Sequence, residues 1–288
     1  DEIDILIDLS GHAPHNRLLT FTHKPAPLQV AWGDYVDTRG VAAIDVLIGD
    51  ATHTPPKDDE RYVERVVRLP TDYVCYVPPP YLPPATQAPA LKAGCMTFGT
   101  FSELTKIQPE TIRLWSEVLK ANPDSRFFAN GYLLADEVRQ GRLLNAFAEH
   151  GIASDRIVIG IGGEHAEFLE QYSEVDVILD TWPYSGGLTT CEALAMGVPV
   201  VTLTGDRFCG RHATAHLRAA GQNQWVAVSE QDFVQIATTL AGDIESLSEQ
   251  RRKLRKQTLA SPLCDVAAFS TAFFRTLRDE WQALCESK

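Results

Sequence analysis

The feature that most constrains the fold of this chain is a series of six short apolar runs between residues 96 and 229. Stretches with helical periodicity separate the runs, and in one of them, 109–121, Ile112, Trp115 and Leu119 recur at helical spacing. The runs are MTFGTF (96–101), RFFAN (126–130), RIVIGIG (156–162), VDVILD (175–180), VPVVTL (198–203) and QWVAVS (224–229). Continuous apolar strands that alternate with helices are typical of a parallel sheet covered on both faces, so we predict one doubly wound α/β domain of about six strands.

A Pro-rich stretch at 78–93, around the sequence VPPPYLPPATQAPA, has no hydrophobic period and predicts an extended linker. Further apolar runs that predict strands lie upstream of it, at 4–10, 27–32 and 44–50. At the other end of the chain, 243–260 and 265–284 predict two long helices with no strand between them. We interpret the basic stripe on the first of these helices as a solvated face. The stripe consists of Arg251, Arg252, Lys253, Arg255 and Lys256.

Composition restricts the classes of function. The 288 residues carry a formal charge of −12, which disfavours sequence-independent binding to nucleic acid. No apolar run approaches the ~18 residues that a membrane span requires. The six cysteines include no CxxC pair, which favours reduced thiols in the cytoplasm, and the eight histidines form no HExxH motif, so nothing signals metal catalysis. Because the chain begins at Asp1, directly before a strand-like run, we expect it to be a fragment with further sequence upstream.

The segment 175–205, VDVILDTWPYSGGLTTCEALAMGVPVVTLTG, carries the clearest chemical signal. It predicts a buried strand that ends at Asp180, a turn that contains Gly186 and Gly187, and a helix that starts near Thr189. A Gly-rich turn between a strand and a helix exposes backbone N–H groups at the positive end of the helix. Such a turn favours the binding of a diphosphate.

Three polar side chains at the start of this predicted helix allow two interpretations. In the first, Thr189 and Thr190 add hydroxyl donors beside the phosphates, and Glu192 accepts from ribose hydroxyls. In the second, the T-x-x-E spacing from Thr189 to Glu192 is a capping box, which opens ordinary helices. The spacing alone leaves both open.

Several ungapped motifs, in order along nearly the whole chain, resemble those of the O-linked N-acetylglucosamine transferase family, glycosyltransferase family 41. The likeness is clearest in DTWPYSGGLTTCEALAMGVPVVTL, within the segment just described. The other motifs are GHAPHNRLLTFTHKPAPLQVAW (11–32), TFGTFSELTKIQPETIRLW (97–115), RFCGRHATAHL (207–217) and TLASPLCDVAAF (258–269).

The resemblance implies an α/β fold of the GT-B type, in which two Rossmann-like lobes face a cleft and the C-terminal lobe holds the donor nucleotide. The N-terminal lobe is then incomplete in this chain, and the last helix crosses back to it. The boundaries that follow are 1–77 for the remainder of the N-terminal lobe, 78–93 for the linker, 94–263 for the nucleotide-sugar-binding lobe and 264–288 for the returning helix.

By the same resemblance, Lys106 in ELTKIQP matches the family lysine that contacts the donor diphosphate. An ammonium suits an enzyme with no metal or other cofactor, because it neutralises the leaving diphosphate. With one phosphate between them, Lys106 and the Gly186–Gly187 turn should lie about 5–8 Å apart, at the C-terminal ends of adjacent strands. The other carried-over donor-binding residues are Thr189 and Thr190 beside the phosphates, Glu192 at the ribose and His165 near the nucleotide. Animal members have that histidine where this chain has Phe168.

Three departures from the family pattern concern the candidate site. The family loop WLGYPGT, which lies against the donor sugar, is WGDYVDT (32–38) here, and its two acids leave the identity of the sugar open. The amide before the family lysine is replaced at Ser102–Glu103, and we expect Glu103 to turn away from the diphosphate or to pair with a cation. A histidine placed near the acceptor in animal members would lie upstream of this chain. His12, at a strand end, is the candidate to replace it, and the alternative is a structural histidine that caps the turn.

We therefore predict a metal-independent, inverting glycosyltransferase that moves a sugar from a UDP-GlcNAc-like nucleotide-sugar to Ser/Thr hydroxyls of a protein. The expected partners are that nucleotide-sugar, the protein acceptor and tetratricopeptide repeats upstream, with no nucleic acid and no membrane span. The motifs have a bacterial character, which favours flagellin or another bacterial surface protein as acceptor. Two alternatives remain: a nucleotide-sugar epimerase of the same architecture, and a nucleotide-binding module that has lost transfer.

Overall fold

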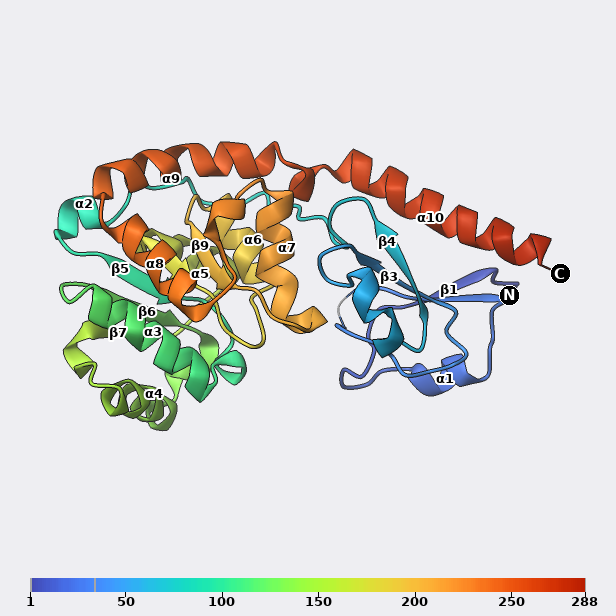
Figure 1. Ribbon diagram of the computed structural model, residues 1–288, viewed down its shortest axis with the longest axis horizontal. Coiled ribbons are helices and arrows are strands. Elements are labelled where there is room, and N and C mark those ends of the chain that lie inside the picture. The colour runs from blue at the N-terminus through green and yellow to red at the C-terminus, as the bar shows by residue number, and fades with distance from the viewer. Residues whose placement is uncertain (1, 34, 288) are drawn as a thin grey trace. The chain divides into compact units, whose positions relative to one another are not determined.

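The computed structural model describes residues 2–33 and 35–287, and the chain forms two compact units (Figure 1). The N-terminal unit contains the chain up to Tyr76, a short insert at Arg207–Cys209 and the segment from Pro262 onward. The C-terminal unit contains Val77–Asp206 and Gly210–Ser261. Across 2–33 and 35–287, no helix is both long enough and apolar enough to cross a membrane.

The N-terminal unit is built on a parallel sheet of four strands in the order β1-β2-β3-β4. Three strands lie in the apolar runs that predict them: β1 (Ile5–Asp8), β2 (Leu28–Ala31) and β3 (Val46–Asp50). The fourth, β4 (Arg65–Leu69), lies outside the predicted runs. Its sequence RVVRL has arginines at the first and fourth positions, so the apolar pattern that marks the other strands is interrupted.

Helices cover both faces of this sheet. On one face, Phe273 and Leu277 of α10 (Val266–Glu286) are buried against the strands. The strand residues that they join are Leu28, Val30, Val46, Ile48 and Leu69. Because successive residues of a strand point to opposite faces, Ala31 and Leu47 face the other way, where they meet Leu18 and Phe21 of α1 (Leu18–Thr22).

The C-terminal unit is built on a parallel sheet of six strands in the order β10-β9-β8-β5-β6-β7. Each strand lies in one of the six predicted runs, so the prediction of a doubly wound α/β fold is confirmed. The strands are β5 (Thr97–Thr100), β6 (Arg126–Asn130), β7 (Ile157–Gly160), β8 (Val177–Leu179), β9 (Val200–Leu203) and β10 (Val226–Ala227). The helices are α2 (Ala90–Ala93), α3 (Pro109–Ala121), α4 (Glu137–Glu149), α5 (His165–Glu170), α6 (Leu188–Ala195), α7 (His212–Ala219), α8 (Glu230–Ala241) and α9 (Ile244–Leu259).

The strand order of this sheet places its ligand-binding edge between β5 and β8. From β5 the chain adds β6 and β7 on one side, and from β8 it adds β9 and β10 on the other. In open α/β sheets, ligands bind at the carboxyl ends of the strands where the order reverses in this way. The segments that follow β5 and β8 are the two that carry Lys106 and the Gly-rich turn.

The interpretation of the basic stripe on α9 as a solvated face is wrong for Arg251. This side chain is fully buried, and its Nη1 donates to the carbonyls of Val175 (2.7 Å) and Asp176 (2.9 Å). The reason is its position between Leu247 and Leu254, which are also buried at helical spacing and turn the same stripe of α9 inward.

Candidate functional site

The turn after β8 is organised around the carboxylate of Asp180, which is buried. Oδ1 accepts from the backbone N–H groups of Thr181 (2.9 Å) and Gly186 (2.7 Å). Oδ2 accepts from the hydroxyls of Ser185 (2.8 Å) and of Thr202 on β9 (2.7 Å). Burial raises the pKa of the Asp180 carboxyl, and these four donors act in the opposite direction. The protein itself therefore holds the turn in shape.

Two helices support this turn. The indole Nε1 of Trp115 on α3 donates to the Asp180 carbonyl at 3.1 Å. Ser185 Oγ, which donates to the Asp180 carboxylate, also accepts from the N–H group of Ala213 in the first turn of α7 at 2.8 Å. Asp180 and Ser185 thus connect two strands, the turn and the start of α7.

The turn leads directly into α6, whose N-cap residue is Gly187 and whose first residue is Leu188. The first N–H groups of a helix have no carbonyl partner within it and carry partial positive charge. A Cβ at Gly186 would lie 3.0 Å from the hydroxyls of Thr189 and Thr190, so both hydroxyls border the turn. The Thr190 hydroxyl donates to the Gly186 carbonyl at 2.9 Å, and it therefore stabilises the turn instead of keeping its proton for a ligand.

The capping-box interpretation of T-x-x-E is wrong. Thr189 is the second residue of α6, and the N-cap residue is Gly187, with no side-chain hydrogen bond capping the helix. Glu192 Oε1 lies 2.8 Å from His165 Nε2, and Oε2 lies 3.5 Å from the hydroxyl of Tyr172, which also donates to the Thr189 carbonyl at 3.1 Å. Burial raises the pKa of the Glu192 carboxyl, while the contact with His165 lowers it.

Lys106 is the last residue of the 3₁₀ turn Leu104–Lys106, which follows β5 in the sequence. Because β5 pairs with β8, Lys106 lies near the turn that follows β8. Its Nζ donates to the Ser185 carbonyl at 3.3 Å and lies 4.1 Å from the centroid of the Tyr184 ring. The structure therefore brings Lys106 and the turn together from adjacent strands, with Nζ at the carbonyl that precedes Gly186. The separation of about 5–8 Å from the N–H groups of the turn stays a prediction. Glu103 is exposed to solvent, and its expected orientation away from a diphosphate stays a prediction. The role of Lys106 stays a prediction.

His165 and Phe168 lie on the same short helix, α5, but in different surroundings. Phe168 is buried, packs edge-on against Phe101 with centroids 5.2 Å apart and stacks on Tyr132 at 6.0 Å. The side chain of His165 is 42% exposed. Phe168, where animal members of the family have their histidine, thus belongs to the core of this chain. A ligand can reach His165 instead.

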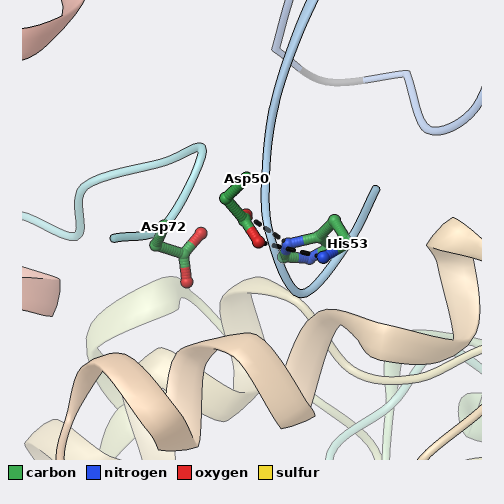
Figure 2. Close-up of side chains that lie close together, drawn as sticks. All are labelled: Asp50, His53 and Asp72. Carbon is green, nitrogen blue, oxygen red and sulfur yellow. Dashed lines mark hydrogen bonds and ion pairs between the residues drawn. The ribbon is translucent and has the colours of Figure 1, made fainter. Parts of the chain in front are cut away.

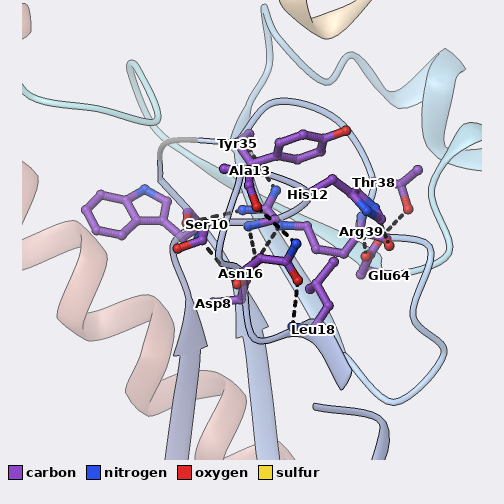
Figure 3. A network of polar contacts seen from close by, with 12 residues as sticks. Asp8, Ser10, His12, Ala13, Asn16, Leu18, Tyr35, Thr38, Arg39 and Glu64 are labelled. Carbon is purple, nitrogen blue, oxygen red and sulfur yellow. Dashed lines mark hydrogen bonds and ion pairs between the residues drawn. The ribbon is translucent and has the colours of Figure 1, made fainter. Parts of the chain in front are cut away.

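In the N-terminal unit, His12 follows β1 and is held by a network built on a buried ion pair (Figure 3). Arg39 Nε donates to Asp8 Oδ2 at 2.8 Å, and the same oxygen accepts from the N–H group of Gly11 at 2.9 Å. His12 Nε2 lies 2.9 Å from the Arg39 carbonyl, and its ring packs edge-on against Tyr35. Because a carbonyl only accepts, this bond assigns the proton to Nε2 and leaves Nδ1 as an acceptor in the neutral imidazole.

The same arginine fastens the loop that departs from the family sequence. The Arg39 guanidinium donates to three carbonyls, those of Trp32 (3.3 Å), Tyr35 (3.0 Å) and Asp37 (3.1 Å). Glu64 accepts from the Thr38 hydroxyl (2.6 Å) and from the Arg39 N–H group (2.7 Å). Asp34, one of the two acids in this loop, lies outside the described residues. The loop is thus held by contacts of this chain's own residues.

A second buried cluster in the N-terminal unit consists of Asp50, His53 and Asp72, with one possible metal-ligand atom of each within 4.8 Å of the others (Figure 2). Protein donors already occupy Asp50. Oδ1 accepts from the N–H groups of Thr52 (2.7 Å) and His53 (2.9 Å), and Oδ2 contacts His53 Nδ1 (2.6 Å) and accepts from the Tyr73 N–H group (2.9 Å). Burial raises the pKa of Asp50, but the hydrogen bonds and charge of His53 outweigh it and hold the pKa below its usual value. We assign Asp50 to anchoring the loop after β3.

Three contributors to the site lie outside the predicted set: Asp180 as an anchor, Ser185 and Tyr184. The sequence did point to the first two by position, because Asp180 ends an apolar strand and Ser185 directly precedes the glycine pair. The contact between Tyr184 and Lys106 depends on which strands are neighbours, and no local pattern predicts it.

Replacing Arg39 with methionine is expected to destabilise the protein by about 3–5 kcal/mol, because it leaves the buried Asp8 carboxylate without its cation. Urea unfolding measures this loss. The control is Arg65→Met in the same unit, which removes an exposed ion pair with Glu280 and should cost about 1 kcal/mol or less. Equal losses in the two variants would contradict the assignment of Arg39 as the anchor of this network.

Comparison with known proteins identifies the family of this chain. The model of Glycosyl transferase family 41 matches residues 1–76 and 84–273. The probable UDP-N-acetylglucosamine–peptide N-acetylglucosaminyltransferase SPINDLY of Solanum lycopersicum is 38% identical over 291 residues, which cover 99% of this chain and 31% of that protein. The SPINDLY protein of Arabidopsis thaliana is 36% identical over 293 residues, which cover 32% of it. The chain thus spans about a third of the length of these relatives.

Among solved structures, a mutant O-GlcNAc transferase of Thermobaculum terrenum superposes with a TM-score of 0.93 at 37% identity, covering 99% of this chain and 54% of that one. Sucrose-phosphate synthase from Thermosynechococcus elongatus superposes with a TM-score of 0.59 at 13% identity, covering 88% of this chain and 68% of that one, a likeness of fold alone. These matches confirm the predicted GT-B fold class. The chain belongs to glycosyl transferase family 41.

Proposed function

We propose that this chain forms part of a catalytic region that transfers a sugar from a nucleotide diphosphate-sugar to Ser/Thr hydroxyls of a protein. One observation carries the proposal: Lys106 Nζ contacts the turn that opens α6, and the two come from the neighbouring strands β5 and β8. An ammonium at the turn that opens a helix fits a diphosphate, because the cation and the first N–H groups of the helix both favour the phosphate charge.

The proposed reaction is a single displacement with inversion at the anomeric carbon. The acceptor oxygen bonds to that carbon as the bond to the diphosphate oxygen breaks, and the electron pair leaves with the diphosphate. Lys106, the N–H groups behind Gly187 and the Thr189 hydroxyl stabilise the charge that develops there, so the proposal needs no metal ion. Thr190 acts indirectly, through its bond to the Gly186 carbonyl.

We assign His12 to the acceptor side as the candidate base. Its Nε2 is bonded to the Arg39 carbonyl, and its ring is supported by Tyr35. The lone pair on Nδ1 can then take the proton of the acceptor hydroxyl as the new bond forms. His12 is exposed, so an acceptor can reach its ring, and the alternative is that it only caps the turn through its bond to the Arg39 carbonyl.

The printed names of the similar proteins favour UDP-N-acetylglucosamine as donor and a peptide as acceptor, and we carry both to this chain as proposals. Glu192 and His165 form the proposed nucleoside end of the donor site. The proposed reaction uses the nucleotide-sugar as a co-substrate and requires no cofactor. A cytoplasmic location and tetratricopeptide repeats upstream, which would present the acceptor, also stay predictions.

Incubation of the protein with UDP-N-acetylglucosamine and a Ser/Thr-containing peptide, with EDTA present, tests this proposal. Mass spectrometry should show the peptide gaining one sugar only when both substrates are present, and NMR should show an inverted anomeric centre. Donor consumption without peptide would favour the epimerase alternative, and UDP binding without turnover would favour a binding module. A thermal-shift panel of UDP, GDP and CMP identifies the nucleotide, since a ligand at 100 times its Kd stabilises the fold by about 2.7 kcal/mol.

A further inference from the structure

A tyrosine from outside the family pattern lies at the nucleoside end of the candidate donor site. Tyr81 belongs to the Pro-rich stretch, in the interval 77–83 that the family model does not match. Its hydroxyl lies 2.8 Å from Nδ1 of His165, and the two rings meet edge-on with centroids 5.7 Å apart. Tyr81 is 52% exposed, so its hydroxyl can meet a ligand while it contacts His165.

The imidazole of His165 connects this hydroxyl to a buried carboxylate. Its Nε2 lies 2.8 Å from Oε1 of Glu192, which is only 2% exposed. A carboxylate only accepts, so Nε2 carries the proton, and in the neutral ring Nδ1 then accepts from the Tyr81 hydroxyl. The bonds therefore run in one direction, from Tyr81 through His165 to Glu192.

This direction gives the Tyr81 oxygen a defined chemical character. A phenolic hydroxyl that donates its proton still has lone pairs to accept with. Donation into a chain that ends on a carboxylate strengthens it as an acceptor, because consecutive hydrogen bonds polarise one another. Of the three hydrogen-bonded residues, Glu192 is buried, and His165 and Tyr81 are exposed.

We propose that the Tyr81 hydroxyl is the acceptor for a ribose hydroxyl of the donor nucleotide, with His165 and Glu192 as positioning residues behind it. The inference rests on the proposed function, since it specifies a contact within that donor site. It also changes the role of Glu192, from a direct ligand of the ribose to the buried acceptor at the end of this series of hydrogen bonds. The position of the three residues beside α6 supports it, because Tyr172 joins Glu192 to the Thr189 carbonyl in the first turn of that helix.

The test compares the affinity of the protein for UDP, 2′-deoxy-UDP and 3′-deoxy-UDP by calorimetry. In the unaltered protein, loss of the recognised hydroxyl should weaken binding by roughly 3- to 10-fold, the worth of one hydrogen bond. Tyr81→Phe should weaken UDP binding by the same factor and bring the ratio of deoxy-UDP to UDP dissociation constants close to one. The ratio is measured on one sample, so a loss of folded protein does not change it. The matched control is Tyr132→Phe, which removes the hydroxyl of another exposed tyrosine in the same unit and should leave the ratio unchanged.

Two further variants separate this arrangement from direct binding by Glu192. His165→Ala interrupts the series of hydrogen bonds from Tyr81 to Glu192 and should lower the ratio of dissociation constants. In that background, Glu192→Gln should not lower the ratio further. A ratio that Tyr81→Phe leaves intact, or that Glu192→Gln still lowers in His165→Ala, overturns the inference while the proposed function stands. An unaltered protein that binds UDP and both deoxy forms equally also overturns it. If the unaltered protein binds none of UDP, GDP and CMP, the inference and the proposed function are overturned together.

Discussion

Replacing Lys106 with alanine is expected to reduce sugar transfer by about 10²–10³-fold, the usual effect of losing one group that stabilises a developing anion. Lys106 Nζ lies within 3.3 Å of the Ser185 carbonyl, in the turn that precedes α6. The variant should also bind UDP more weakly while its affinity for uridine stays nearly the same, because we propose that the ammonium contacts the diphosphate and not the nucleoside. Turnover assays and calorimetry with both ligands measure the two effects.

The control for this variant is Lys120→Ala. Lys120 lies on α3 in the same unit and pairs with Glu117 at the surface, so its loss changes the net charge equally without touching the turn. Equal effects of the two substitutions on UDP affinity would indicate that only overall charge matters. Full turnover by Lys106→Ala would mean that the turn is no more than a helix start, and the proposed mechanism would lose its main support.

The four central strands of the C-terminal unit, β5, β6, β8 and β9, could be predicted from the sequence because they are buried on both faces. A strand such as Val177–Leu179 has no solvated side, so its residues form an unbroken apolar run. β4 shows the limit of this signal. Arg65 and Arg68 interrupt its apolar residues, and Arg68 is held by contacts with Thr54 and Asp59 that only the folded chain creates. Arg251 shows the same limit in a helix, since its buried role depends on carbonyls from a distant strand end.

The site divides in a similar way. Local patterns predicted the Gly-rich turn, and the family resemblance, with one diphosphate site at the ends of adjacent strands, predicted that Lys106 would lie near it. The partners of each side chain could not be predicted, because they lie far away in sequence. Glu192 fits a capping box by spacing, yet its carboxylate is bound by His165 from another helix. His165 in turn is held by Tyr81 from a stretch that predicts only a linker.

Replacing Asp180 with alanine is expected to cost more than about 4 kcal/mol of stability and to abolish UDP binding, the largest structural effect at this site. The substitution removes the acceptor of four buried donors, the N–H groups of Thr181 and Gly186 and the hydroxyls of Ser185 and Thr202. Each unsatisfied buried donor costs about 1–3 kcal/mol, although water entering the space left by the side chain offsets part of the sum. Without its anchor, the turn no longer presents its N–H groups in one arrangement.

Two comparisons make this expectation sharp. Asp136→Ala is the matched control: Asp136 caps α4 in the same unit through the N–H groups of Val138 and Arg139, so its loss should cost about 1 kcal/mol and leave UDP affinity unchanged. Asp180→Asn keeps the volume and one acceptor oxygen but turns an amide N–H₂ toward two donors. It should therefore unfold at a urea concentration between those of the unaltered protein and Asp180→Ala, and bind UDP weakly while still folded. If Asp180→Ala unfolds at the same urea concentration as Asp136→Ala, the turn has another anchor. If Asp180→Asn binds UDP as tightly as the unaltered protein, diphosphate binding does not depend on the shape of the turn that Asp180 holds.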